Sequence, residues 1–188
     1  MHSDSGLDEP AWVSEVLGYW FDELGDAHWF AMNPDVDAQI RDRFLALHER
    51  LATQDDGGLA TPRTLLAAVI VLDQFSRNLF RQTPKAYAAD VKARRLSEAA
   101  IRQGFDSAMT DSERMFLYLP FEHSEDREDQ ARSVALFEKL GNAYWTRYAL
   151  AHQAIIDRFG RFPHRNTVLD RQSSAEEIAL LQDPMGSF

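Results

Sequence analysis

The sequence predicts an all-α protein, built as an array of antiparallel helical hairpins with about seven to eight helices. Three observations support this prediction. Apolar residues recur at intervals of three and four along most of the chain. Proline or a capping residue precedes most of these segments, as is typical of helix starts. The connections between them are mostly short turns, which place consecutive helices side by side in opposite directions.

The first half of the chain contains three predicted helices. The first begins at Asp8-Glu9-Pro10, where acids and a proline suit a helix start, and extends to about Leu24. A second begins at Asn33-Pro34. One face of that helix carries Val36, Ile40, Phe44, Leu47 and Leu51. A third begins at Thr61-Pro62 and is apolar nearly all round from Leu65 to Leu72, so we expect it at the centre of the fold.

Two helices follow in the middle of the chain. A fourth begins at Thr83-Pro84 by the same arrangement of cap and proline, ends near Gly104, and forms a hairpin with the third. A capping box over Thr110 to Glu113 begins a fifth. We expect the fifth helix to end before Pro120, because the residue before a proline disfavours the helical conformation.

Three further helices complete the pattern. Two of them occupy 126–140 and 143–159, separated by a glycine-asparagine turn. Gly160 stands where a helix commonly ends in a left-handed residue. The last helix follows Ser173-Ser174, where either of two capping boxes can form.

The composition indicates one globular domain and disfavours several classes of function. With 188 residues, the chain can bury one sizeable core, and 1–188 is interpreted as a single domain with frayed ends at 1–8 and 183–188. A net charge of −10 disfavours nucleic acid and anionic membranes as partners, because both require a basic surface. The lack of cysteine excludes disulfides and thiol nucleophiles. With no signal peptide or membrane span recognisable, a cytoplasmic location is expected.

Three polar stretches are candidates for a functional site, and the first spans 73–81. Asp73, Arg77 and Arg81 are spaced by four, so they are expected to form a row along one side of the third helix. Because that helix is otherwise apolar, these charges must be paired. Asn78 adds neutral hydrogen-bonding groups beside them. An internal ion-pair network and a ligand-binding role are both open at this point.

The second polar stretch spans 122–126 and follows a proline. Ser124 is expected to cap the next helix, with the acids beside it near the positive end of the helix dipole. Capping does not explain Glu122 and His123. These two are therefore candidate catalytic residues, a carboxylate and an imidazole for proton transfer, although adjacent side chains often point apart.

The third polar stretch, 158–166, alternates arginines with aromatic residues across the end of a helix. It supplies more hydrogen-bond donors than a helix end requires, and converging guanidinium groups suit a carboxylate or a phosphate. We expect the three stretches to meet in space. The predicted ligand-binding residues are Asp73, Arg77, Asn78, Arg81, Arg161, His164, Arg165 and Asn166. The alternative is that these arginines pair only with carboxylates of the chain itself.

No metal or other cofactor is predicted. His123, His152 and His164 lack the i, i+4 spacing of metal ligands on a helix. His152 lies on an apolar helical face, where a hydrogen-bonded core histidine is more common than a ligand. The sequence contains neither a phosphate-binding loop nor a dinucleotide fingerprint nor a serine nucleophile elbow.

The three stretches together resemble a widespread, mainly bacterial family of uncharacterised helical proteins, a domain of unknown function within the tetratricopeptide-like superfamily. The blocks that carry the resemblance are DQFSRNLFR, FLYLPFEHSE and RFGRFPHRN, and with their spacing it covers about Ala11 to Leu181. The resemblance implies an all-helical, tetratricopeptide-like fold, although the specific pattern of that repeat does not recur at a fixed period here. It implies no activity, because the family has none established.

Three functions are compatible with these observations. The favoured one is a binding module whose groove, lined by arginine, histidine and asparagine, holds an anionic small molecule or an acidic peptide end. The second is an enzyme, such as a hydrolase, in which Glu122 or His123 acts as acid or base beside an arginine anion clamp. In the third, the polar residues are purely a structural brace.

Overall fold

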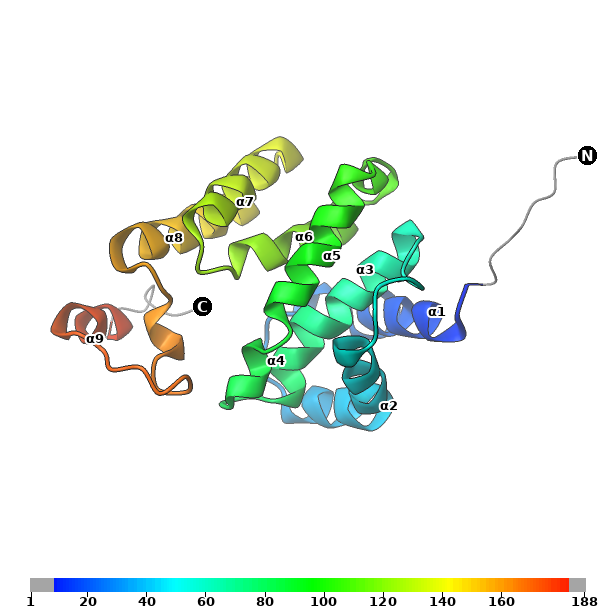
Figure 1. Ribbon diagram of the computed structural model, residues 1–188, viewed down its shortest axis with the longest axis horizontal. Helices are drawn as coiled ribbons and strands as arrows, with labels where there is room; N and C mark the ends of the chain where they lie inside the picture. The colour runs from blue at the N-terminus through cyan, green and yellow to red at the C-terminus, as the bar shows by residue number, and fades with distance from the viewer. Residues whose placement is uncertain (1–8, 183–188) are drawn as a thin grey trace, which may run out of the picture.

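Helices form all the regular structure of the computed structural model, which describes residues 9–182 and has no strand among them (Figure 1). The α-helices are α1 (Ala11–Leu17), α2 (Pro34–Thr53), α3 (Pro62–Ile70), α4 (Ser76–Leu79), α5 (Asp90–Arg102), α6 (Asp111–Glu122), α7 (Arg127–Leu140), α8 (Ala143–Phe159) and α9 (Ala175–Leu181). The all-α prediction is confirmed. The ends predicted to fray, 1–8 and 183–188, lie outside the described residues.

Two π-helical segments extend these helices without a break. Gly18–Leu24 continues α1, so the first helix reaches Leu24 as predicted. Val71–Phe75 joins α3 to α4. Because α3 and α4 are one helix, the described part contains eight continuous helices besides short 3-10 turns, within the predicted number. A π-turn inside a helix is rare and is commonly found at functional sites.

Consecutive helices pack against one another along the chain. α3 packs against α5, α5 against α6, α6 against α7, and α7 against α8, while α2 lies along the Val71–Phe75 segment and α4 (Figure 1). None of the described helices is long and apolar enough to cross a membrane.

The central helix is the most buried element, as the sequence predicts. Every residue from Thr64 to Ser76 is buried. Phe75 lies at its most enclosed point, with its ring centroid 4.9 Å from that of Phe44 and 5.4 Å from that of Trp20. These rings connect α1, α2 and the central helix in one core, since aromatic side chains contribute large buried areas.

The predicted end of a helix before Pro120 is wrong, because α6 continues through the proline to Glu122. A proline lacks the N–H that bonds to residue i−4, so it removes one hydrogen bond from the helix. Pro120 stands in the last turn, and both it and Phe121 are buried, so their packing offsets the loss. The helix is capped by His123, whose N–H bonds to the carbonyl of Leu119 at 2.9 Å.

Two helix starts near the polar stretches also differ from prediction. Asp126, not Ser124, caps α7, and its carboxylate accepts hydrogen bonds from two backbone N–H groups of the first turn. The hydroxyl of Ser124 donates instead to the carboxylate of Asp129 at 2.7 Å. The proline after Thr83 begins only a 3-10 turn, Pro84–Tyr87, and α5 begins at Asp90. This places Asp90 close to the central helix.

We predict that Phe75→Ala lowers the free energy of unfolding by about 3–5 kcal/mol, because it opens a cavity in a site with no exposed surface. Urea or thermal unfolding followed by circular dichroism measures this. Phe30→Ala is the matched control, because the Phe30 side chain is 65% exposed, and it should cost less than about 1 kcal/mol. Equal losses in the two variants would contradict the placement of Phe75 in the core.

Candidate functional site

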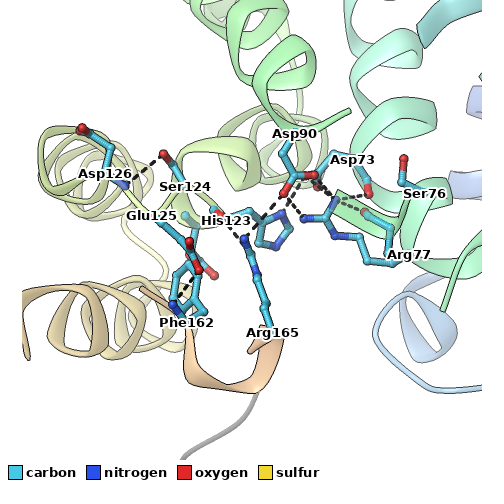
Figure 2. A network of polar contacts seen from close by, with 12 residues as sticks. Asp73, Ser76, Arg77, Asp90, His123, Ser124, Glu125, Asp126, Phe162 and Arg165 are labelled. Carbon is cyan, nitrogen blue, oxygen red and sulfur yellow. Dashed lines mark hydrogen bonds and ion pairs between the residues drawn. The ribbon is translucent and has the colours of Figure 1, made fainter. Parts of the chain in front are cut away.

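The three polar stretches meet between the central helix, the α6–α7 turn and the loop after α8, as expected (Figure 2). The Nδ1 of His123 lies 2.8 Å from Oδ1 of Asp73, which joins the first stretch to the second. The guanidinium of Arg165 donates to the backbone oxygen of His123 at 2.9 Å, which joins the third. Figure 2 also shows Asp90 between Arg77 and Arg165.

Asp73 is a fully buried carboxylate in the Val71–Phe75 π-segment. Burial alone would raise its pKa, but the electrostatic interactions with His123 and Arg77 and two hydrogen bonds hold the pKa well below its usual range. One of those bonds comes from Nε2 of Gln74 at 2.6 Å. Because an ionised carboxylate only accepts hydrogen bonds, the Nδ1 of His123 carries the proton toward Asp73.

His123 is thereby oriented by Asp73 through one ring nitrogen only. Its other nitrogen, Nε2, makes no hydrogen bond to any residue of the described part, and the side chain is partly exposed. In the neutral ring, this Nε2 is the free acceptor. A buried carboxylate that fixes the tautomer of a histidine, with the far nitrogen left accessible, is an arrangement that acid–base catalysis uses.

Arg77 has a structural role, because carboxylates of the protein fully compensate its charge. It makes a bidentate pair with Asp90, the Nη2–Oδ2 distance being 2.9 Å, and lies 3.5 Å from Asp73. Burial would lower the pKa of Arg77, but Asp73 and Asp90 outweigh this and raise it. The pair ties the central helix to the start of α5.

Arg165 is buried without a bidentate carboxylate. Its guanidinium lies between two aromatic rings, with Cζ 4.6 Å from the centroid of Tyr87 and 4.6 Å from that of Phe162. Its contact with Asp90, 3.8 Å from Nη1 to Oδ2, is too long for a hydrogen bond, and Nε has no partner within the described residues. Burial lowers the pKa of Arg165, and the charge of Arg77 acts in the same direction. The surrounding carboxylates therefore do not fully compensate this cation.

The loop that carries Arg165 is fixed to the α6–α7 turn by Glu125. Gly160 ends α8 in the left-handed conformation predicted for it, with φ of 68°. The carboxylate of Glu125 then accepts the backbone N–H of Phe162 at 2.8 Å and a bidentate pair from Arg171 at 2.7 and 3.0 Å. Glu125 therefore fixes the position of this loop, although in sequence it lies just before the start of α7.

A pocket of about 330 Å³ adjoins these residues. Its polar lining includes Asp90, Arg94, His123, Ser124, Glu125 and Arg165, and Tyr87 and Leu169 contribute apolar surface. This volume lies at the lower end of the range for small-molecule sites, which is about 300–1,000 Å³. Residues of the second and third stretches thus border one cavity together with Asp90, the partner of Arg77, whereas Asp73 and Arg77 are not among its lining residues.

Several predicted ligand-binding residues lie elsewhere. The helix ends at Leu79, so Arg81 leaves the predicted row and forms a bidentate pair with Asp37, which also accepts a hydrogen bond from Asn78 at 2.7 Å. These groups border a separate surface hollow. The single row of Asp73, Arg77 and Arg81 is therefore corrected to two separate ion-pair groups.

The remaining predicted residues of the third stretch also point away from the pocket or beneath it. Arg161 pairs with Glu177 at 2.7 and 2.9 Å, which fixes α9 to the end of α8. Asn166 donates to the hydroxyl of Ser173 at 3.0 Å. The ring of His164 lies 5.7 Å from that of Phe162, and burial followed by the nearby guanidinium lowers its pKa to about 4. A single converging set of four arginines does not form.

Glu122 does not pair with its neighbour His123. It is buried behind the site, with Oε1 3.3 Å from Nδ1 of His152. Burial and then the charge of Asp73 raise the pKa of Glu122 to about 8, while burial lowers the pKa of His152 to about 3. Both groups are therefore uncharged at neutral pH, and the short distance is not an ion pair. Within 9–182, no three histidine, aspartate or glutamate side chains gather closely enough to hold a metal ion.

Sequence reasoning missed the roles of Asp90, Tyr87 and Arg171. Asp90 and Tyr87 stand in an ordinary helix start, and no local pattern marks them as partners of residues far along the chain. Glu125 was recognised only as a helix-start acid. The sequence offered one signal for these distant partners. The 158–166 stretch has more arginines than nearby acids, so some of its guanidinium groups needed carboxylates from elsewhere in the chain.

Comparisons with known proteins agree with this fold. The family described as "bacterial protein of unknown function (DUF924)" matches residues 16–185. The chain belongs to this family. A solved structure of a protein of unknown function from Agrobacterium tumefaciens, ATU0120, is 38% identical, with a TM-score of 0.87 over 92% of this chain and 97% of the other. No curated protein matches the chain.

The Glu122–His152 pair predicts a pH dependence of stability. The folded protein keeps the proton of Glu122 up to about pH 8, whereas the unfolded chain releases it near 4.5, so the folded state binds more protons between these values. The free energy of unfolding should therefore fall as pH rises toward 8. His152 has the opposite effect only between its folded pKa of about 3 and its ordinary 6.5.

The measurement is the unfolding free energy between pH 6.5 and 8, where only Glu122 of this pair acts. The wild-type value should decline more steeply than that of Glu122→Gln, by up to about 1.4 kcal/mol per pH unit. Glu138→Gln removes an exposed glutamate on α7 and should follow the wild type. Parallel profiles for the wild type and Glu122→Gln would refute the raised pKa.

Proposed function

We propose that this protein binds a small anionic ligand through Arg165 in the pocket between the start of α5, the α6–α7 turn and the loop after α8. The observation that carries the proposal is the buried guanidinium of Arg165, stacked between Tyr87 and Phe162 and without a bidentate carboxylate. A planar guanidinium fixed in this way suits a phosphate or a carboxylate, which accepts two parallel hydrogen bonds.

The other arginines support the structural brace that the sequence offered as an alternative. Arg77, Arg81 and Arg161 each make a bidentate pair with a carboxylate of the chain, so they have little capacity left for a ligand. Their pairs join elements that are distant in sequence. In this proposal, Arg77, Arg81 and Arg161 brace the fold, whereas Arg165 binds the ligand.

The pocket favours a small ligand over a peptide end. Its volume of about 330 Å³ suits a compact metabolite, and Arg94 and His123 lie on its wall together with Arg165. Arg94 is already paired with Asp129, the Nε–Oδ2 distance being 3.1 Å. His123 and Arg165 are therefore the two contacts that an anion would meet first.

Binding is testable with inorganic phosphate as the probe. Increasing phosphate at constant ionic strength should raise the thermal midpoint of the wild type, since a ligand at about 100 times its Kd stabilises the folded state by about 2.7 kcal/mol. Arg165→Gln should abolish most of this shift. Arg50→Gln, an exposed arginine on α2, should keep it. A phosphate shift that persists in Arg165→Gln would refute the proposal.

A second candidate function is acid–base catalysis by His123. It is favoured by the hydrogen bond from Nδ1 of His123 to the buried Asp73, at 2.8 Å, and by the absence of a partner for Nε2 within the described residues. In this candidate Asp73 is the positioning residue, and Glu122 has no role in proton transfer because it lies on the other side, against His152. The bound anion and the imidazole of His123 would then lie in the same cavity.

Catalysis predicts a specific response in a screen of phosphate and carboxylate esters. For any ester that the wild type hydrolyses, His123→Ala should lower kcat by about 100-fold to 10,000-fold, because a general acid or base contributes that much. Asp73→Asn should lower kcat and displace its pH profile. His28→Ala, at an exposed histidine, should leave kcat unchanged. Turnover that survives His123→Ala would exclude this role.

Two broader proposals accompany the binding function. The succession of packed hairpins from α3 to α8 supports a tetratricopeptide-like arrangement of the helices. The lack of cysteine in the sequence supports a reducing, cytoplasmic location.

A further inference from the structure

A second and larger groove lies away from the Arg165 pocket, between the first helix, the segment around Trp29 and the starts of α6 and α8. Its volume is about 1030 Å³. Its aromatic lining consists of Phe21, Trp29, Phe30, Tyr144 and Trp145. A soluble protein rarely exposes so many aromatic rings in one concave surface without a binding role.

The aromatic rings on one side of the groove are fixed by buried neighbours. The indole Nε1 of Trp29 donates to the backbone oxygen of Trp20 at 2.8 Å, and its ring stands edge-on to Phe116 at 4.9 Å. Phe30 stacks on Phe116 at 6.0 Å and yet is 65% exposed. On the other side Tyr144 is 60% exposed. These rings therefore present their surfaces to solvent in a preformed arrangement.

Carboxylates without partners border the same groove. Asp22 and Asp26 are exposed, and neither makes an ion pair or a side-chain hydrogen bond within the described residues. Arg63, the one cation among the described lining residues, is already paired with Glu9 at 2.9 Å. Aromatic faces next to uncompensated carboxylates attract ammonium and guanidinium groups, through the ring quadrupole and the opposite charge together.

We propose that this groove binds a basic peptide segment, with lysine or arginine side chains between the exposed rings and the carboxylates of Asp22 and Asp26. Its volume exceeds what a compact small molecule fills, which favours an extended segment over a free amine. The net charge of −10 would speed the approach of a basic partner and disfavour a second copy of this chain. This proposal does not depend on the Arg165 pocket.

A titration with a hexaarginine peptide tests the proposal, with calorimetry and tryptophan fluorescence as readouts. The wild type should bind at physiological ionic strength, and the double variant Asp22→Asn/Asp26→Asn should bind at least about tenfold more weakly, as should Phe30→Ala. The matched control is Asp35→Asn/Asp42→Asn, which removes two exposed aspartates of α2 and changes the net charge equally, from −10 to −8. This control should change affinity less than about threefold.

Four results would overturn the proposal. The first is an absence of hexaarginine binding to the wild type. The second is an equal loss of affinity in both double variants, which would show that binding follows net charge alone. The third is spermidine binding as tightly as the peptide, which would assign the groove to a free amine. The fourth is a dimer in sedimentation that Phe30→Ala dissociates, which would assign this surface to self-association.

Discussion

The compensation of one buried charge, the carboxylate of Asp73, governs the arrangement of the polar residues around the central helix. A carboxylate with no exposed surface is stable only if opposite charges and hydrogen-bond donors surround it. Gln74 and Arg77 come from the same helix, and His123 comes from the end of α6. The placement of α6 against α3 is therefore specified by a polar contact as well as by apolar packing.

The arginines near Asp73 differ in how far carboxylates of the protein neutralise their charge. Arg77 lies between Asp73 and Asp90, and its charge is neutralised where it stands. Arg165 lies over the rings of Tyr87 and Phe162 and donates to the backbone oxygen of His123, so cation–π contacts and one hydrogen bond stabilise a charge that no bidentate pair neutralises. Because the nearby carboxylates compensate the buried charge of Arg165 only in part, a bound anion would complete the compensation. This contrast separates the arginines that brace the fold from Arg165, the one proposed to bind a ligand.

The Arg165 pocket and the Trp29 groove differ in the chemistry of their linings. The pocket at Arg165 combines a guanidinium and an imidazole, whereas the groove at Trp29 combines aromatic faces and free carboxylates. Under the two proposals, the protein would hold a small anion at one site while it contacts a basic segment at the other. The Gly18–Leu24 π-helical segment borders the groove through Phe21 and Asp22, whereas the Val71–Phe75 segment carries Asp73, which contacts His123 of the pocket wall. Such segments are commonly retained where side chains must be redirected for function.

By itself the sequence determined the all-α class, the number of continuous helices and most of their boundaries, because caps, prolines and glycines act within a few residues. The capping box at Thr110 and the left-handed Gly160 are examples. It also determined that the three polar stretches belong together, since a buried helix with charges requires partners. It failed at Pro120, where packing of the last turn offset the lost hydrogen bond.

Only the tertiary structure decided which carboxylate each arginine meets. Asp90, Glu177 and Asp37 stand 13, 16 and 44 positions from the arginines that they pair with, and nothing local distinguishes them from other acids. The tertiary structure also decided that the partner of His123 is Asp73 and not Glu122. Neighbouring side chains at a helix end diverge, whereas a residue 50 positions away can be brought within 2.8 Å by the packing of two helices.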